Sequence, residues 1–152
     1  MKPLETTQEE VLRKAIQSEV DTRAFYQKLA ERAGTEDVRK RLRQLADGEL
    51  VHRAKLERRY REVVGQLPPD PEQPNVEIGN DVFNLDMAKA LKIALERERD
   101  SESYFRFMAE RVPNTDLGRL FMELAEMEWK HKTDLQSEYD SVAAPDQFLL
   151  DI

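Results

Sequence analysis

The stretch LADGELVH, residues 45–52, returns in altered form as LAEMEWKH at residues 124–131. Each copy places a glutamate three positions before a histidine: Glu49 precedes His52, and Glu128 precedes His131. The chain contains no other histidine. Because residues three apart lie on the same face of a helix, each copy presents a carboxylate and an imidazole side by side.

The similarity extends well beyond these two stretches. A shift of 79 positions aligns the two halves of the chain without a gap. It superimposes Ala15 on Ala94, Glu19 on Glu98, Asp21 on Asp100 and Leu56 on Leu135. A single long period with two copies indicates duplication of one supersecondary unit and argues against a solenoid.

Apolar residues at helical spacing predict four helices, over about residues 7–34, 35–64, 86–112 and 115–139. Thr7 and Glu10 fit a capping box at the start of the first, Gly34 fits its end, and Asp86 is the expected N-cap of the third. The segment GQLPPDPEQPNVEIGND, residues 65–81, holds four of the seven prolines and is therefore expected to be an extended connection.

Two helical hairpins joined by one long crossover indicate an all-α fold, a ferritin-like four-helix bundle. We expect one domain over residues 1–140, with the crossover at about 65–85. The tail at 141–152 is expected to dock on the bundle.

Glu19 and Glu98, which precede the two Glu-x-x-His motifs, are expected at the same height along the helices as the motif of their own hairpin. Gly34 lies midway between Glu19 and Glu49, and Pro113 lies midway between Glu98 and Glu128. In an antiparallel hairpin, the members of each pair then lie at equal height, about 22 Å from the turn at 1.5 Å per residue. All six polar residues also lie on or beside the apolar stripe of their helices: Glu19, Glu49, His52, Glu98, Glu128 and His131.

Four buried carboxylates without compensation would cost several kcal/mol each. Two divalent ions would neutralise them, and glutamate with imidazole suits iron, manganese or zinc. One glutamate from each of two helices and Glu-x-x-His from each of the other two is the ligand pattern of di-iron carboxylate bundles. The alternative is a bundle that keeps the pattern without binding metal.

AIQSEVDTRAFYQKLAERA (15–33) and ALERERDSESYFRFMAERV (94–112), with the two motifs that follow them, resemble the halves of a rubrerythrin-type ferritin-like domain. The resemblance implies two iron ions that react, when reduced, with hydrogen peroxide or dioxygen. It implies terminal ligands Glu19 and Glu98, bridging ligands Glu49 and Glu128, and capping ligands His52 and His131. Tyr26 stands where such proteins often place a tyrosine beside the centre, although it also fits a core aromatic.

Two features depart from this family pattern. The chain has no cysteine, so it lacks the cysteine-ligated rubredoxin domain of full-length rubrerythrins, and a separate donor protein would have to supply electrons. Rubrerythrins also have an additional carboxylate on the third helix, about one turn from the ligand that aligns with Glu98. In this chain the positions three before and three after Glu98 hold Leu95 and Ser101, and Glu96 and Glu102 lie nearby. A six-ligand, bacterioferritin-like centre is therefore open, as is the participation of Glu96 or Glu102.

Composition narrows the function classes. The net charge of -7 disfavours nucleic acid as a partner, and no apolar run reaches membrane-spanning length. We expect a cytoplasmic homodimer that acts as a di-iron peroxidase or ferroxidase in oxidative stress or iron metabolism. The alternatives are an iron-storage protein and a non-catalytic helical scaffold.

Overall fold

The computed structural model describes residues 3–150, and side chains for residues 8–143. These residues form four helices: α1 (Pro3–Ala30), α2 (Glu36–Val64), α3 (Met87–Arg111) and α4 (Asp116–Leu150). No strand occurs among them. The predicted fold class, an all-α ferritin-like four-helix bundle, is confirmed. In the described part of the chain, none of the helices combines the length and apolar character that a membrane crossing needs.

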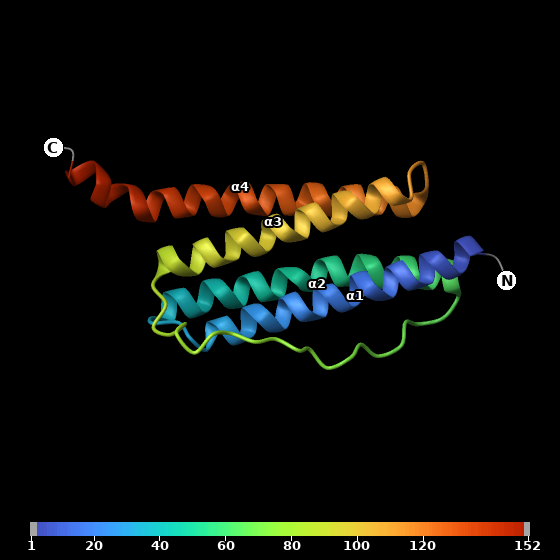
Figure 1. Ribbon diagram of the computed structural model, residues 1–152, viewed down its shortest axis with the longest axis horizontal. Helices are drawn as coiled ribbons and strands as arrows, with labels where there is room; N and C mark the ends of the chain where they lie inside the picture. Colours follow the sequence, from blue (N-terminus) through green and yellow to red (C-terminus); the bar gives the residue numbers. More distant parts are fainter. Residues whose placement is uncertain (1–2, 151–152) are drawn as a thin grey trace. The chain divides into compact units, whose positions relative to one another are not determined.

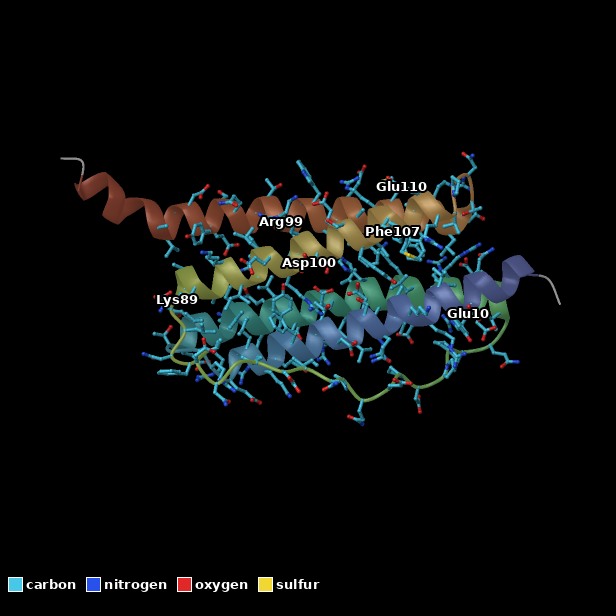
Figure 2. The ribbon with its side chains drawn as sticks, viewed as in Figure 1. Glu10, Lys89, Arg99, Asp100, Phe107 and Glu110 are labelled. Atoms are coloured by element: carbon cyan, nitrogen blue, oxygen red, sulfur yellow. The ribbon has the colours of Figure 1, made fainter. Side chains whose placement is uncertain are left out.

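The helices pair as two hairpins, α1 with α2 and α3 with α4 (Figure 1). The chain divides accordingly into two compact units, Met1–Asn84 and Leu85–Ile152. Charged side chains such as Glu10, Lys89 and Glu110 are exposed along the helices (Figure 2). The first unit contains the crossover as well as its hairpin.

Each hairpin has an apolar core between its two helices. In the first, Leu12 and Leu29 of α1 and Leu42 and Leu56 of α2 are almost completely buried. Burial of a side chain of this size stabilises the fold by about 1.5–3 kcal/mol. The second hairpin has an aromatic core: Phe105 of α3 stacks on Phe121 of α4 with 6.1 Å between ring centroids, and Leu91, Leu117, Leu124 and Leu135 are also buried.

Side-chain caps fix three of the helix starts. Thr35 accepts a hydrogen bond from the Val38 amide, and Asp86 accepts one from the Lys89 amide at 2.8 Å. Thr115 accepts one from the Gly118 amide at 2.9 Å. These contacts satisfy amides that the first turn of a helix leaves without a partner. The predicted starts of α2, α3 and α4 are confirmed to within about one residue.

Two predicted helix ends and one start were wrong. The helix α1 begins at Pro3, so Thr7 lies inside it and is not the N-cap; proline is favourable in a first helical turn. It ends at Ala30, before Gly34. The helix α4 continues through the predicted tail to Leu150. Docking of the tail concerns side chains outside the described residues.

The crossover follows its own α1 (Figure 1). Gln17 exchanges two hydrogen bonds with the backbone of Glu72, and Lys28 donates to the Val76 carbonyl at 2.8 Å. Further along, Arg32 donates to the carbonyls of Gly79 and Val82. Two side chains of α1 and one that directly follows the helix therefore hold the extended segment along α1.

Candidate metal centre

The first hairpin gathers three potential metal ligands. Glu19 comes from α1, and Glu49 and His52 come from α2, one turn apart. The Nδ1 atom of His52 lies 3.6 Å from Oε2 of Glu19 and 3.5 Å from Oε2 of Glu49. One ligand atom from each residue lies within 4.8 Å of the other two. The equal height that the sequence predicts for Glu19 and Glu49 is therefore present in this hairpin.

These three side chains are almost completely buried: Glu19 and Glu49 are 3% exposed and His52 is 0% exposed. Burial raises the pKa of Glu19 well above its ordinary value; the Glu49 carboxylate raises it further, and His52 acts in the opposite direction. The Oε2 atom of Glu19 accepts no hydrogen bond from the residues that the structure describes. A buried carboxylate oxygen of this kind, beside a second carboxylate and an imidazole, fits a divalent cation such as iron or manganese.

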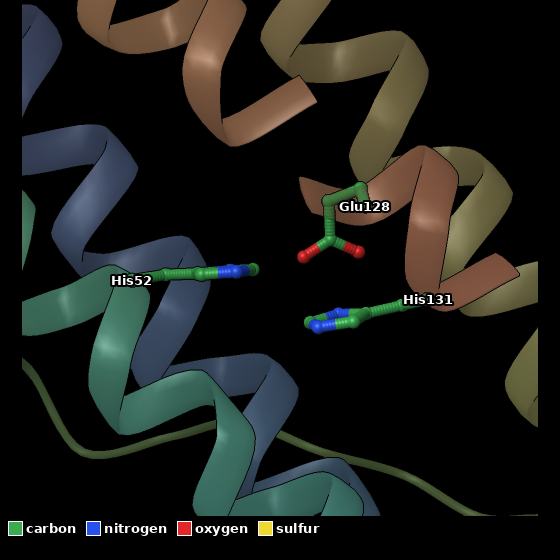
Figure 3. Close-up of side chains that lie close together, drawn as sticks. All are labelled: His52, Glu128 and His131. Carbon is green, nitrogen blue, oxygen red and sulfur yellow. The ribbon is translucent and has the colours of Figure 1, made fainter. Parts of the chain in front are cut away.

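The second hairpin carries the corresponding set. Glu98 of α3 is 1% exposed and Glu128 of α4 is 0% exposed, whereas His131 is partly exposed. Glu128 and His131 project from the same side of α4, as the Glu-x-x-His spacing predicts (Figure 3). Figure 3 also shows His52 projecting from α2. The predicted inward-facing glutamates of this hairpin are thus buried residues of the fold.

Tyr26 is fully buried on α1, and its ring packs edge-on against Phe25 with 5.6 Å between centroids. It lies two turns after Glu19, on the same side of the helix. Thr22, which the sequence reasoning did not single out, is 2% exposed and lies between them. Its position three residues after Glu19 and four before Tyr26 was the available signal. The buried face of α1 thus carries a column of three polar side chains.

Glu102 has partners of its own within the second hairpin. Its carboxylate accepts hydrogen bonds from Lys132 Nζ at 2.6 Å and from Arg106 Nε at 2.8 Å. Burial acts to raise the pKa of Glu102, but the Lys132 and Arg106 cations outweigh it and hold the pKa below its ordinary value. Glu96 is exposed. Glu102 is thus paired with two cations inside the hairpin, whereas Glu96 lies on the surface.

Comparison with known proteins agrees with this description. The family model of rubrerythrin matches residues 10–139. The fold is similar to that of a hypothetical protein from Pyrococcus furiosus, with a TM-score of 0.64 and 27% sequence identity. That similarity covers 91% of this chain and 92% of the other. None of the curated proteins matches the chain.

Proposed function

The chain belongs to the rubrerythrin family, and from this we propose that it is a di-iron oxidoreductase that reacts with hydrogen peroxide or dioxygen. The observation that carries the proposal is the buried cluster of Glu19, Glu49 and His52, with His52 Nδ1 3.5–3.6 Å from both carboxylates. Burying two carboxylates beside an imidazole costs free energy, and a cation that binds between them offsets this cost.

We propose six ligands, three from each hairpin. Glu19 and Glu98 would be terminal ligands, Glu49 and Glu128 would bridge the two ions, and His52 and His131 would each cap one ion. Four carboxylates match the charge of two divalent cations, and no thiolate is needed. Manganese and zinc accept the same ligand types, so the bound metal is part of the test.

When bound, two ferrous ions would supply the two electrons that, with two protons, convert hydrogen peroxide into two molecules of water. The protein contributes the surroundings of that reaction. Leu45 and Leu124, four residues before Glu49 and Glu128, are buried, and they would help to keep water away from the carboxylates. Tyr26 would offer its hydroxyl as a hydrogen-bond donor on the same side of α1 as Glu19. Because this chain has no cysteine-ligated centre, a separate donor protein would return the electrons.

The test is stopped-flow mixing of the anaerobic ferrous protein with hydrogen peroxide, and separately with dioxygen. The ferric absorption should appear faster in the wild-type protein than in Glu49→Ala and Glu128→Ala, and the faster of the two oxidants identifies the substrate. Glu96→Ala, which alters an exposed glutamate of α3, is the matched control and should react like the wild type. Equal rates in all four proteins would contradict the redox function.

A further inference from the structure

We propose that the outer face of α2 around Leu50 and Val51 is the surface on which an acidic electron-donor protein docks. This inference rests on the proposed function, because that function needs a separate donor. It adds where the donor binds and what charge the donor carries. All the residues of this docking surface belong to α2, so the surface is defined within the first hairpin alone.

The centre of the docking surface is apolar. Leu50 is 42% exposed and Val51 is 51% exposed, whereas Glu49 and His52, on either side of them in the chain, are buried. The exposed Ala54 follows Val51 by three residues and Leu50 by four, so these three side chains are neighbours on the helix. The side of a helix that faces away from its core is normally polar, and apolar side chains grouped there indicate a contact with another molecule.

Gly48 lies one turn before Val51 and widens the approach to the helix. A glycine inside a helix lowers its stability, yet the backbone of Gly48 is helical and does not require one. Packing does not require it either: apart from its own helix, no described part of the chain lies within 4 Å of the position that a Cβ atom would take. A partner that comes close to the backbone of α2 explains the glycine, because a side chain would stand in its way.

Basic residues surround the apolar centre. Residues 40–61 contain eight lysines and arginines and three acidic residues, whereas the whole chain has a net charge of -7. Arg43 precedes Leu50 by seven residues and Arg58 follows Val51 by seven, so each lies two turns from the centre on the same side of α2. The exposed cations of this side are Lys40, Arg43, Arg58 and Arg61.

Two acidic side chains on this side of α2 have arginine partners. Asp47 lies 3.9 Å from Arg23 of α1. Glu62 lies 3.4 Å from Arg58 and 3.2 Å from Arg59. Because one carboxylate is shared by two arginines, the rim of the docking surface stays basic. An apolar centre inside a charged rim is the usual composition of a protein–protein interface.

The charge of the rim argues for an acidic partner and against a second copy of this chain. A two-fold contact centred on Val51 would bring the same surface of two chains together, so that cations would face cations. Such like-charge contacts suppress association. An acidic partner turns the same charges into an attraction that speeds the encounter, which suits a short-lived complex for electron transfer.

The docking surface is also next to two of the proposed ligands. Glu49 and His52 adjoin Leu50 and Val51 in the chain, so only the backbone of α2 separates a donor on this face from these ligands. Each donor molecule would release one electron and would itself be oxidised by one electron. Two donor molecules in succession would therefore return two ferric ions to the ferrous state, and no covalent bond forms or breaks.

The experiment measures docking without metal in this chain. The probe is an acidic rubredoxin in which zinc replaces iron, so that it binds without electron transfer. The full-length, metal-free, ¹⁵N-labelled protein is titrated with this probe, and NMR records the amide shifts. We expect the largest shifts within residues 47–54. Binding should weaken at least about tenfold between about 0.01 M and about 0.15 M ionic strength, because the Debye length falls from about 30 Å to about 8 Å.

Three variants test the surface. Arg43→Glu should weaken binding of the probe at least about tenfold, since it reverses a charge of the rim. Lys92→Glu makes the same change of charge at an exposed position of α3 and should bind like the wild type. Gly48→Gln should also weaken binding, although glutamine favours a helix more than glycine does. Far-ultraviolet circular dichroism verifies that each variant is folded.

Several outcomes would overturn the docking surface. They are absence of binding, shifts concentrated outside residues 40–61, and equal binding by Arg43→Glu and the wild type. Equal shifts with a basic cytochrome c would contradict the role of charge. A wild-type dimer that becomes a monomer in Val51→Asp, measured by light scattering, would show that a second copy covers this face.

Failure of this inference is distinguishable from failure of the proposed function. Docking is measured on the metal-free protein, so loss of docking leaves the reaction of the ferrous protein with peroxide or dioxygen as a separate result. A protein that binds the probe as expected, but whose ferrous form reacts with neither oxidant, supports the docking surface and contradicts the proposed function.

Discussion

Glu102 of α3 and Lys132 of α4 form an ion pair across the second hairpin, with Oε1 2.6 Å from Nζ. The second oxygen of the same carboxylate accepts from Arg106, so both oxygens have cationic partners. Glu102 follows the proposed ligand Glu98 by one helical turn, and Lys132 follows His131 directly. The pair therefore holds α3 to α4 beside the proposed ligands, and it provides a role for Glu102 that does not involve metal.

Glu102→Gln should leave the number of bound metal ions unchanged and lower the free energy of unfolding. The amide keeps the shape of the side chain but loses the charge that pairs with Lys132 and Arg106. We expect a loss of about 1 kcal/mol, because water partly screens the pair. Metal analysis together with urea unfolding checks both parts. If the variant binds one ion fewer than the wild type, Glu102 is a ligand and the ion-pair assignment is wrong.

The contribution of Glu102 should also depend on pH. Its pKa is lower in the folded protein than its ordinary value of 4.5, so its stabilising effect is present above that value and is lost as pH falls through the folded pKa. The difference in unfolding free energy between the wild type and Glu102→Gln should therefore be full at pH 7 and shrink below about pH 4.5. Thermal unfolding at several pH values measures it. A difference that grew in acid would refute the assignment.

Glu19→Gln should stabilise the metal-free protein and weaken metal binding. Burial raises the pKa of Glu19, so the folded state is destabilised as pH rises from the ordinary pKa through the folded one. A neutral amide avoids the burial of that charge, and a gain of about 1–2 kcal/mol in the presence of a chelator is expected at pH 7. Urea unfolding with and without Mn²⁺ measures the two effects.

The exposed Glu96 supplies the control for that comparison: Glu96→Gln should change the unfolding free energy by less than about 0.5 kcal/mol in either condition. If Glu19→Gln instead lowers the unfolding free energy in the presence of the chelator, the Glu19 carboxylate must have a stabilising partner when no metal is bound.

Periodicity and local chemistry predicted the parts of the fold that depend on short-range contacts. Asp86 caps α3 as predicted, because a side-chain oxygen one turn before an amide is a local arrangement. Glu19 and Glu49 meet because equal distance from a turn fixes equal height in a hairpin. The start of α1 was predicted wrongly because the spacing of Thr7 and Glu10 matches a capping box, but the same spacing also occurs within a continuous helix.

Contacts between residues far apart in the sequence could not be predicted from local patterns. Thirty residues separate Lys132 from Glu102, and only the packing of α3 on α4 decides that they meet. The same holds for Arg32, whose bonds to the Gly79 and Val82 carbonyls follow from the path of the crossover.

Arg32→Ala should loosen the end of the crossover with little effect on the helices. Its guanidinium donates to two backbone carbonyls, at 3.2 Å and 2.5 Å, and alanine cannot replace either bond. Cleavage between residues 76 and 84 by a protease of broad specificity should become about tenfold faster, since about 1.4 kcal/mol of local stability is lost. Arg58→Ala, which changes an exposed arginine within α2, is the control and should be cleaved like the wild type. An unchanged cleavage pattern in Arg32→Ala would mean that other contacts hold the segment.

Tyr26→Phe separates the two interpretations of this buried residue. The change removes the hydroxyl and keeps the ring that packs against Phe25; the aligned position in the second hairpin is already a phenylalanine, Phe105. If the hydroxyl assists the reaction, oxidation of the ferrous protein by peroxide should slow about tenfold or more, as for the loss of a positioned proton donor. The stability should change by about 1 kcal/mol or less. Stopped-flow rates and urea unfolding on the same samples distinguish the cases, and an unchanged rate would identify Tyr26 as a core aromatic.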